Sequence, residues 1–209
     1  MEILKKLHKS LAVALLLILS NSISAQENGQ MQEAFTQSYT WELGKNFNKA
    51  IDALKASYDP VSYEYNVRLG WLSYFAGQYS ESEAYYQKAI ALKPFALEPR
   101  FGVIMPATAE GNFKMAEDQY KKILEIDPMN TIANYRLGQL YFGKEDFENA
   151  KIHFEKVVNL YPFDYDSVIA FARTQYKLGN LREAKVLFSK ALLIRPGDQS
   201  ASDGLQMIK

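Results

Sequence analysis

Apolar and small side chains recur at intervals of three and four residues, a period typical of helices with one buried face. In residues 131–143, the positions that share one face are Asn134, Leu137, Gly138 and Tyr141. After a break of turn residues at 143–146, the next segment repeats the pattern with Ala150, Phe154, Val157 and Val158. The pattern predicts two helices joined by a turn, in which Gly138 and Ala150 let the paired backbones approach closely and aromatic rings fill the space beside them.

Five prolines stand 34 residues apart along the chain, at Pro60, Pro94, Pro128, Pro162 and Pro196. Small residues keep the same step ahead of the last four prolines, at Ser82, Ala116, Ala150 and Ala184. An aromatic residue follows each of them by four positions, at Tyr86, Tyr120, Phe154 and Phe188. A proline has no amide hydrogen and clashes with the preceding turn, so each one is expected to end the second helix of a unit. A fixed period of this kind predicts an array of helical hairpins.

These residues resemble the tetratricopeptide repeat family, whose 34-residue pattern is Trp-x2-Leu-Gly-x2-Tyr, then Ala-x3-Phe, then Pro. Residues 131–164 match the pattern at Leu137, Gly138, Tyr141, Ala150, Phe154 and Pro162, with Asn134 in place of the tryptophan. The copies at 63–96, 97–130 and 165–198 match at fewer positions. The resemblance implies an all-α fold, a right-handed superhelical array of helical hairpins (an α-solenoid) with four clear repeats and a degenerate N-terminal one.

The expected organisation follows from the period. It comprises a signal peptide at 1–25, a short linker at 26–30, a degenerate hairpin at 31–60, repeats at 61–96, 97–130, 131–164 and 165–198, and a C-terminal capping helix at 199–209. In the last helix, Leu205 and Ile208 are expected to face inward. Neighbouring hairpins of such an array share one continuous core.

The first 25 residues have the composition of a secretory signal peptide. Three lysines precede an apolar run from Leu11 to Leu19, and small and polar residues lead to Ala25. Nine apolar residues rise only about 14 Å as a helix, too little for a hydrocarbon core of about 30 Å. We therefore expect cleavage after Ala25, an exported protein of a bacterial periplasm or envelope, and no membrane span in the processed chain.

Composition excludes several kinds of chemistry. The chain has no cysteine, and its 24 basic residues balance its 24 acidic ones. Removing the leader leaves 21 basic and 23 acidic residues, a net charge of −2, which argues against nucleic acid as a partner. His153 is the one histidine after the leader and is interpreted as a packing residue. Asp164 and Asp166 are interpreted as helix N-terminal residues, so we expect no catalytic site, no metal and no cofactor.

The resemblance places the first helix of each repeat along a concave groove that holds a peptide or a partner helix. The groove-facing residues would be Phe35, Tyr39, Trp71, Tyr74, Phe75, Phe101, Met105, Tyr135, Gln139, Phe142, Arg173 and Tyr176. Trp71 and Tyr74 are the expected anchors, because aromatic residues dominate binding hot spots.

Two functions remain open at this point. The first is a non-enzymatic adaptor or scaffold that binds a protein or peptide through the aromatic groove. The second is a carbohydrate-binding accessory of polysaccharide export or assembly, because aromatic rings also stack on sugar faces.

Pro106 falls well inside the first helix of its repeat. It removes a backbone hydrogen bond and crowds the carbonyl of Gly102, a cost of about 3 kcal/mol in a regular helix. We therefore expect a bend there.

Overall fold

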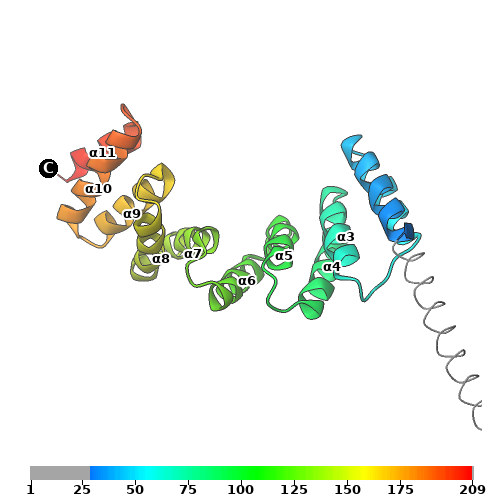
Figure 1. Ribbon diagram of the computed structural model, residues 1–209. Helices are drawn as coiled ribbons and strands as arrows, with labels where there is room; N and C mark the ends of the chain where they lie inside the picture. Colours follow the sequence, from blue (N-terminus) through cyan, green and yellow to red (C-terminus); the bar gives the residue numbers. More distant parts are fainter. Residues whose placement is uncertain (1–28, 209) are drawn as a thin grey trace, which may run out of the picture. The chain divides into compact units, whose positions relative to one another are not determined.

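The computed structural model describes residues 29–208, which form a series of helices joined by turns and loops (Figure 1). The first described helix covers residues 29–43. It is followed by α2 (Phe47–Lys55), α3 (Tyr63–Phe75), α4 (Tyr79–Leu92), α5 (Glu98–Ala109), α6 (Phe113–Ile126), α7 (Thr131–Gly143), α8 (Phe147–Leu160), α9 (Tyr165–Lys177), α10 (Leu181–Ile194) and α11 (Gln199–Met207). Residues 29–208 contain no strand, so the all-α array of helical hairpins is confirmed. The expected signal peptide and the first three residues of the linker lie outside the described residues.

The chain forms two compact units that divide between Pro94 and Phe95. In the first unit, α3 packs against both α2 and α4. In the second unit, each helix from α5 to α11 packs against the next one in the sequence. Each unit is described below by itself.

Side-chain caps and turn residues set the helix boundaries. Asn130 and Asp164 accept hydrogen bonds from the backbone amides of Ala133 and Ser167, so they are the N-caps of α7 and α9. The expected role of Asp164 is confirmed. The turns inside successive hairpins place a residue with positive φ at the same point of the period, at Gly77, Gly111, Glu145 and Gly179. The local sequence thus stops and restarts each helix at intervals of 34 residues.

Close packing of a ring on a glycine holds the hairpins together. The face of Gly138 on α7 lies against the ring of Phe154 on α8, and Gly70 on α3 lies against Tyr86 on α4 in the same way. Phe154 and Tyr86 are almost completely buried. The predicted role of Gly138 as a point of close approach is confirmed. At the C-terminal end, Leu205 and Ile208 pack partly buried against the core cluster that contains Phe188, as expected.

Pro106 does not interrupt its helix, because α5 runs from Glu98 to Ala109 and continues for three residues beyond it. Pro99 lies in the first turn, where a proline costs no helical hydrogen bond. The hydroxyl of Thr108 donates to the carbonyls of Ile104 and Met105 in the turn that contains Pro106. The bend at Pro106 stays a prediction.

Candidate functional site

A pocket of about 420 Å³ opens between the first helices of two successive hairpins in the second unit. Its lining combines residues of α7 and α9 with Phe154 of α8: Tyr135, Gln139, Phe142, Gly143, Phe154, Tyr165, Asp166, Ile169, Ala170 and Arg173. Four of the expected groove residues are therefore brought together, namely Tyr135, Gln139, Phe142 and Arg173. We call this hollow the groove pocket.

Aromatic contacts fix the walls of the groove pocket. The ring of Tyr135 meets Phe154 edge to face at 5.8 Å between centroids, and Phe142 meets Phe147 in the same way at 5.3 Å. Phe154 and Ile169 are buried and form its base. The polar side chains above this base are held by neighbours, since Gln139 accepts a hydrogen bond from Arg136 and Arg173 donates to Ser200. The pocket therefore has a rigid apolar base and a polar rim.

Opposite charges stand at the two ends of the groove pocket. Asp166 and Arg173 are seven residues apart on α9, which corresponds to about 10 Å along a helix. Burial raises the pKa of the Tyr135 hydroxyl above its ordinary value, and the carboxylate of Asp166 raises it further. Tyr135 therefore stays a neutral hydrogen-bonding group, and the pocket can hold an apolar side chain between a negative and a positive end.

The first unit contains a separate aromatic surface formed by the helix at 29–43, α2 and α3. Trp71 is 37% exposed and Phe75 is 44% exposed. Phe75 is the centre of this surface. The centroid of its ring lies 4.6 Å from that of Trp71, 5.2 Å from that of Tyr74 and 5.5 Å from that of Phe47. These contacts bring Trp71, Tyr74 and Phe75 together as the sequence suggested.

An ion pair that the sequence did not reveal holds Trp71 in place. The indole Nε1 of Trp71 donates to Oε1 of Glu42 at 2.6 Å, and Arg68 pairs with Oε2 of the same carboxylate at 2.7 Å. The guanidinium of Arg68 also lies 3.7 Å from the ring centroid of Tyr39. Burial raises the pKa of Glu42, but the hydrogen bonds from Arg68 and Trp71 outweigh burial and leave that pKa below its ordinary value.

Four other expected groove residues pack against the cores of the two units more than they line a groove. Phe35 meets Tyr65 edge to face at 5.2 Å and packs against the core cluster of the first unit. Phe101 packs against the cluster that contains Ile104 and Ile123. Met105 is half-buried on α5, and Tyr176 is half-buried beside the core of the second unit. These four side chains support the helices more than they offer free surface.

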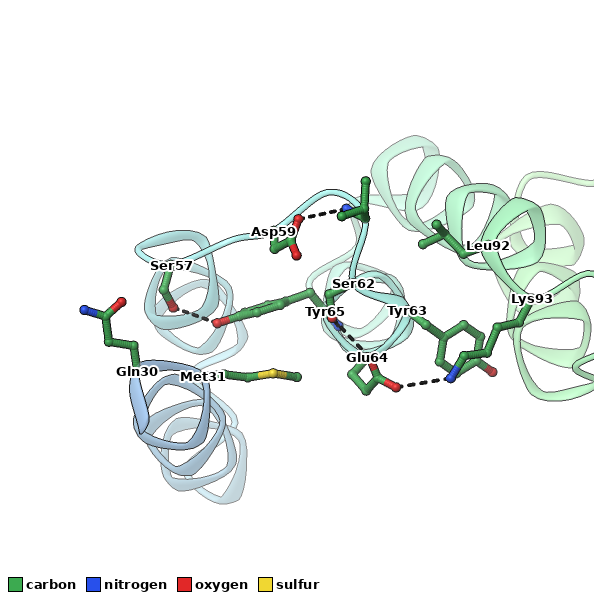
Figure 2. Close-up of a pocket in the computed structure, with 11 residues that line it drawn as sticks. Gln30, Met31, Ser57, Asp59, Ser62, Tyr63, Glu64, Tyr65, Leu92 and Lys93 are labelled. Atoms are coloured by element: carbon green, nitrogen blue, oxygen red, sulfur yellow. Dashed lines mark hydrogen bonds and ion pairs between the residues drawn. The ribbon is translucent and has the colours of Figure 1, made fainter. Parts of the chain in front are cut away.

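A second hollow, of about 550 Å³, lies in the first unit and was not expected from the sequence (Figure 2). It is formed at the start of α3, by residues of the helix at 29–43, the α2–α3 loop and the end of α4. Its polar groups bond to one another: Ser57 with Tyr65 at 2.7 Å, and Lys93 with Glu64 at 3.2 Å, as the dashed lines of Figure 2 show. These four side chains therefore have partners within the hollow.

His153 is held as a packing residue. Its Nδ1 lies 2.9 Å from Oδ1 of Asn134, and its ring stacks on Tyr141 at 5.5 Å. Burial lowers the pKa of His153, and the charges of Lys156 and Lys121 lower it further. Among residues 29–208, no group of three or more His, Asp or Glu side chains is arranged to hold a metal ion. In the same part of the chain, no helix is both long and apolar enough to span a bilayer.

The fold, with α7 and α9 lining the groove pocket, places the protein in the class of helical-hairpin repeat proteins. The sequence model of the tetratricopeptide repeat matches residues 63–95 and 132–164, which contain the α3–α4 and α7–α8 hairpins. The α3–α4 and α7–α8 hairpins are therefore tetratricopeptide repeats.

Solved structures with the same fold share low sequence identity with this chain. A tetratricopeptide repeat protein from Parabacteroides merdae has a TM-score of 0.72 and 20% identity, over 86% of this chain and 72% of that one. The MamA protein has a TM-score of 0.68 and 20% identity, over 80% of this chain and 92% of that one. YrrB, described as a repeat protein with an unusual peptide-binding site, has a TM-score of 0.68 and 15% identity, over 88% of this chain and 97% of that one. Among curated proteins, none matches the chain.

Proposed function

We propose that this scaffold binds a protein or peptide partner in an extended conformation along α7 and α9, with one apolar side chain of the partner in the groove pocket. The observation that supports the proposal is the pocket itself, in which Tyr135, Phe142 and Arg173 from two successive first helices surround one apolar base. A rigid array presents such a surface without an ordering cost at the moment of binding.

The charges at the two ends of the groove pocket support a peptide as the ligand. Asp166 and Arg173 are both exposed, so a partner side chain of either sign meets an opposite charge at one end. Fixed charges at a binding surface set the register and direction of a bound chain more than its affinity. YrrB has a peptide-binding site on the same fold, which agrees with a peptide as the ligand here.

We further propose that the protein acts in a bacterial envelope, as the processed form of an exported precursor. The support is the basic start, the apolar run Leu11–Leu19 and the small-residue exit at Ala25. Mass spectrometry of the protein recovered from its host tests this proposal. A mature chain that begins at Gln26 in the envelope fraction is expected, and an intact N-terminus in the cytoplasmic fraction would contradict it.

Charge reversal at the groove pocket tests the binding proposal. Affinity capture from envelope extracts, followed by titration of synthetic peptides from the captured proteins, identifies the ligand. Arg173→Glu is expected to weaken that ligand at least about tenfold, because it removes the positive end of the groove pocket.

Arg182→Glu is the matched control, because it makes the same charge change at an exposed position of α10. It should bind like the parent chain, and both variants should keep the parent's circular dichroism. Equal binding by the two variants would count against the groove pocket as the site. Capture of glycans in place of proteins would favour the carbohydrate alternative.

A further inference from the structure

An apolar patch lies at one edge of the second unit, where the loop between α8 and α9 adjoins the start of α7. Its members are exposed large side chains: Met129, Ile132, Leu160, Tyr161 and Phe163. Phe163 follows the periodic Pro162 and is 69% exposed. Exposed apolar side chains that gather on one part of a surface mark an interaction site. We call these five residues the edge patch.

A hollow of about 380 Å³ adjoins the edge patch, and two members of the patch, Ile132 and Tyr161, line it. Its apolar lining comes from Ile132, Tyr135, Val157 and Tyr161. We call it the edge hollow. Because Phe163 stands in the loop between Tyr161 and Asp164, both of which line the edge hollow, a protruding ring and a cavity that can receive a ring belong to the same surface.

The rim of the edge hollow has opposite charges on its two sides. Arg136 of α7 lies on one side, and Asp164 and Asp166 lie on the other, at the start of α9. A two-fold axis through the edge patch would bring Arg136 of one copy next to the carboxylates of the other. Self-complementarity in both shape and charge is what an isologous interface requires.

We propose that the edge patch is the interface of a two-fold symmetric dimer of this chain, in which Phe163 of each copy enters the edge hollow of the other. The alternative occupant, a membrane surface, fits the charges less well. Asp127, Asp164 and Asp166 stand beside the apolar side chains, and carboxylates are repelled by anionic lipid.

The dimer has a consequence for the scaffold. Tyr135 and Asp166 line both the groove pocket and the edge hollow, so the dimer interface lies directly beside the groove pocket. Each dimer therefore presents two groove pockets to a partner. A partner with two binding segments gains avidity from such an arrangement with no new contact.

Sedimentation velocity over a wide concentration range tests the dimer, with protein expressed from the full-length sequence so that the host processes it. The parent chain is expected to show a concentration-dependent dimer. Phe163→Ser should raise the dimer dissociation constant at least about tenfold, because it removes the ring that fills the edge hollow.

Leu193→Ser is the matched control, since Leu193 is 75% exposed on α10 and lies outside the edge patch. It should dimerise like the parent chain. A parent chain that is monomeric at every concentration would overturn the proposal, as would equal dimerisation of the Phe163→Ser and parent chains.

A charge swap tests the two-fold arrangement independently of the apolar contact. Arg136→Asp should weaken the dimer, and adding Asp166→Arg in the same chain should restore it. A double variant that stays as weak as the single one would contradict the pairing. Binding of a monomeric parent chain, but not of Phe163→Ser, to vesicles of phosphatidylethanolamine and phosphatidylglycerol would assign the edge patch to a membrane instead and overturn the dimer.

Discussion

Gly138 shows how a single missing side chain fixes the geometry of a hairpin. A Cβ atom at this position would lie 2.7–2.9 Å from ring carbons of Phe154, closer than side-chain carbons approach in folded proteins. Phe154 is buried and meets the ring of Tyr135 edge to face, so a shift of its ring would disturb that contact. The absence of a side chain at Gly138 therefore sets the distance between α7 and α8.

Gly138→Ala is expected to destabilise the protein by about 1–2 kcal/mol, because overpacking outweighs the higher helix propensity of alanine. Urea unfolding followed by circular dichroism measures the effect. Gly143→Ala is the matched control, since Gly143 belongs to the same helix and a Cβ there meets no atom within 4 Å. The control should be neutral or more stable by up to about 1 kcal/mol. Equal effects of the two substitutions would show that the ring contact is unimportant.

The role of Gly138 was predictable from the sequence, whereas the role of Asn134 was not. Glycine and aromatic residues at a fixed spacing within a helical period already imply close packing of a ring on a backbone. Asn134 was expected on the shared helix face, in place of the family's tryptophan, but its hydrogen-bond partners were not expected. In the structure its side-chain amide donates to the carbonyls of Pro128 and Asn130 and its oxygen meets His153. Those partners lie in a loop and on another helix, and no periodicity specifies them.

At the scale of helices, one buried carboxylate connects α6 to the turn that follows α7. Glu117 is almost fully buried and pairs with Lys121 on its own helix at 2.7 Å and with Lys144 at 2.5 Å. Hydrogen bonds from these two lysines lower the pKa of Glu117 from its ordinary 4.5 to about 2. The ion pairs thus stabilise the packing of successive hairpins.

The stability that Glu117 contributes depends on pH in a defined direction. Because the folded-state pKa is lower than the unfolded one, the contribution is complete above pH 4.5 and is lost as the pH falls toward 2. Glu117→Gln should cost about 1–2 kcal/mol at neutral pH, less than the full shift implies, because water screens both half-exposed lysines.

Urea unfolding as a function of pH checks this dependence. The parent chain should lose more stability than Glu117→Gln between pH 4.5 and 2. Glu125→Gln is the control, since it removes an exposed ion pair with Lys122 on the same helix and should change little. Parallel curves for the parent chain and Glu117→Gln would contradict the assigned role.

The sequence predicted which helices carry the candidate site, but only some of the residues that line it. The repeat register placed Tyr135, Gln139, Phe142 and Arg173 on the first helices of their repeats, and these four side chains do line one pocket. Tyr165 and Asp166, which complete that pocket, come from the start of α9 and were missed as ligand-facing residues. The register also could not show that Glu42 fixes Trp71, because that hydrogen bond joins two helices whose side-chain conformations depend on tertiary packing.

At the scale of the whole molecule, the chain divides into two compact units, each with its own core. In a repeat array, stability is close to a sum of local terms between neighbouring units, so distant segments need not unfold together. The two tryptophans of the chain, Trp41 and Trp71, both belong to the first unit. Tryptophan fluorescence therefore reports the first unit alone, whereas far-ultraviolet circular dichroism reports helices of both.

This asymmetry gives a test of independent unfolding. Gly138→Ala acts on the second unit, so it should shift the urea transition seen by circular dichroism and leave the fluorescence transition in place. Gly70→Ala is the reciprocal variant, because a Cβ there would lie 2.9 Å from ring carbons of Tyr86 in the first unit. It should shift the fluorescence transition, together with only that part of the circular dichroism transition that comes from the first unit. If either substitution moved both transitions by the same amount, the two units would be one cooperative structure, and a partner bound to the groove pocket would then stabilise the first unit as well as the second.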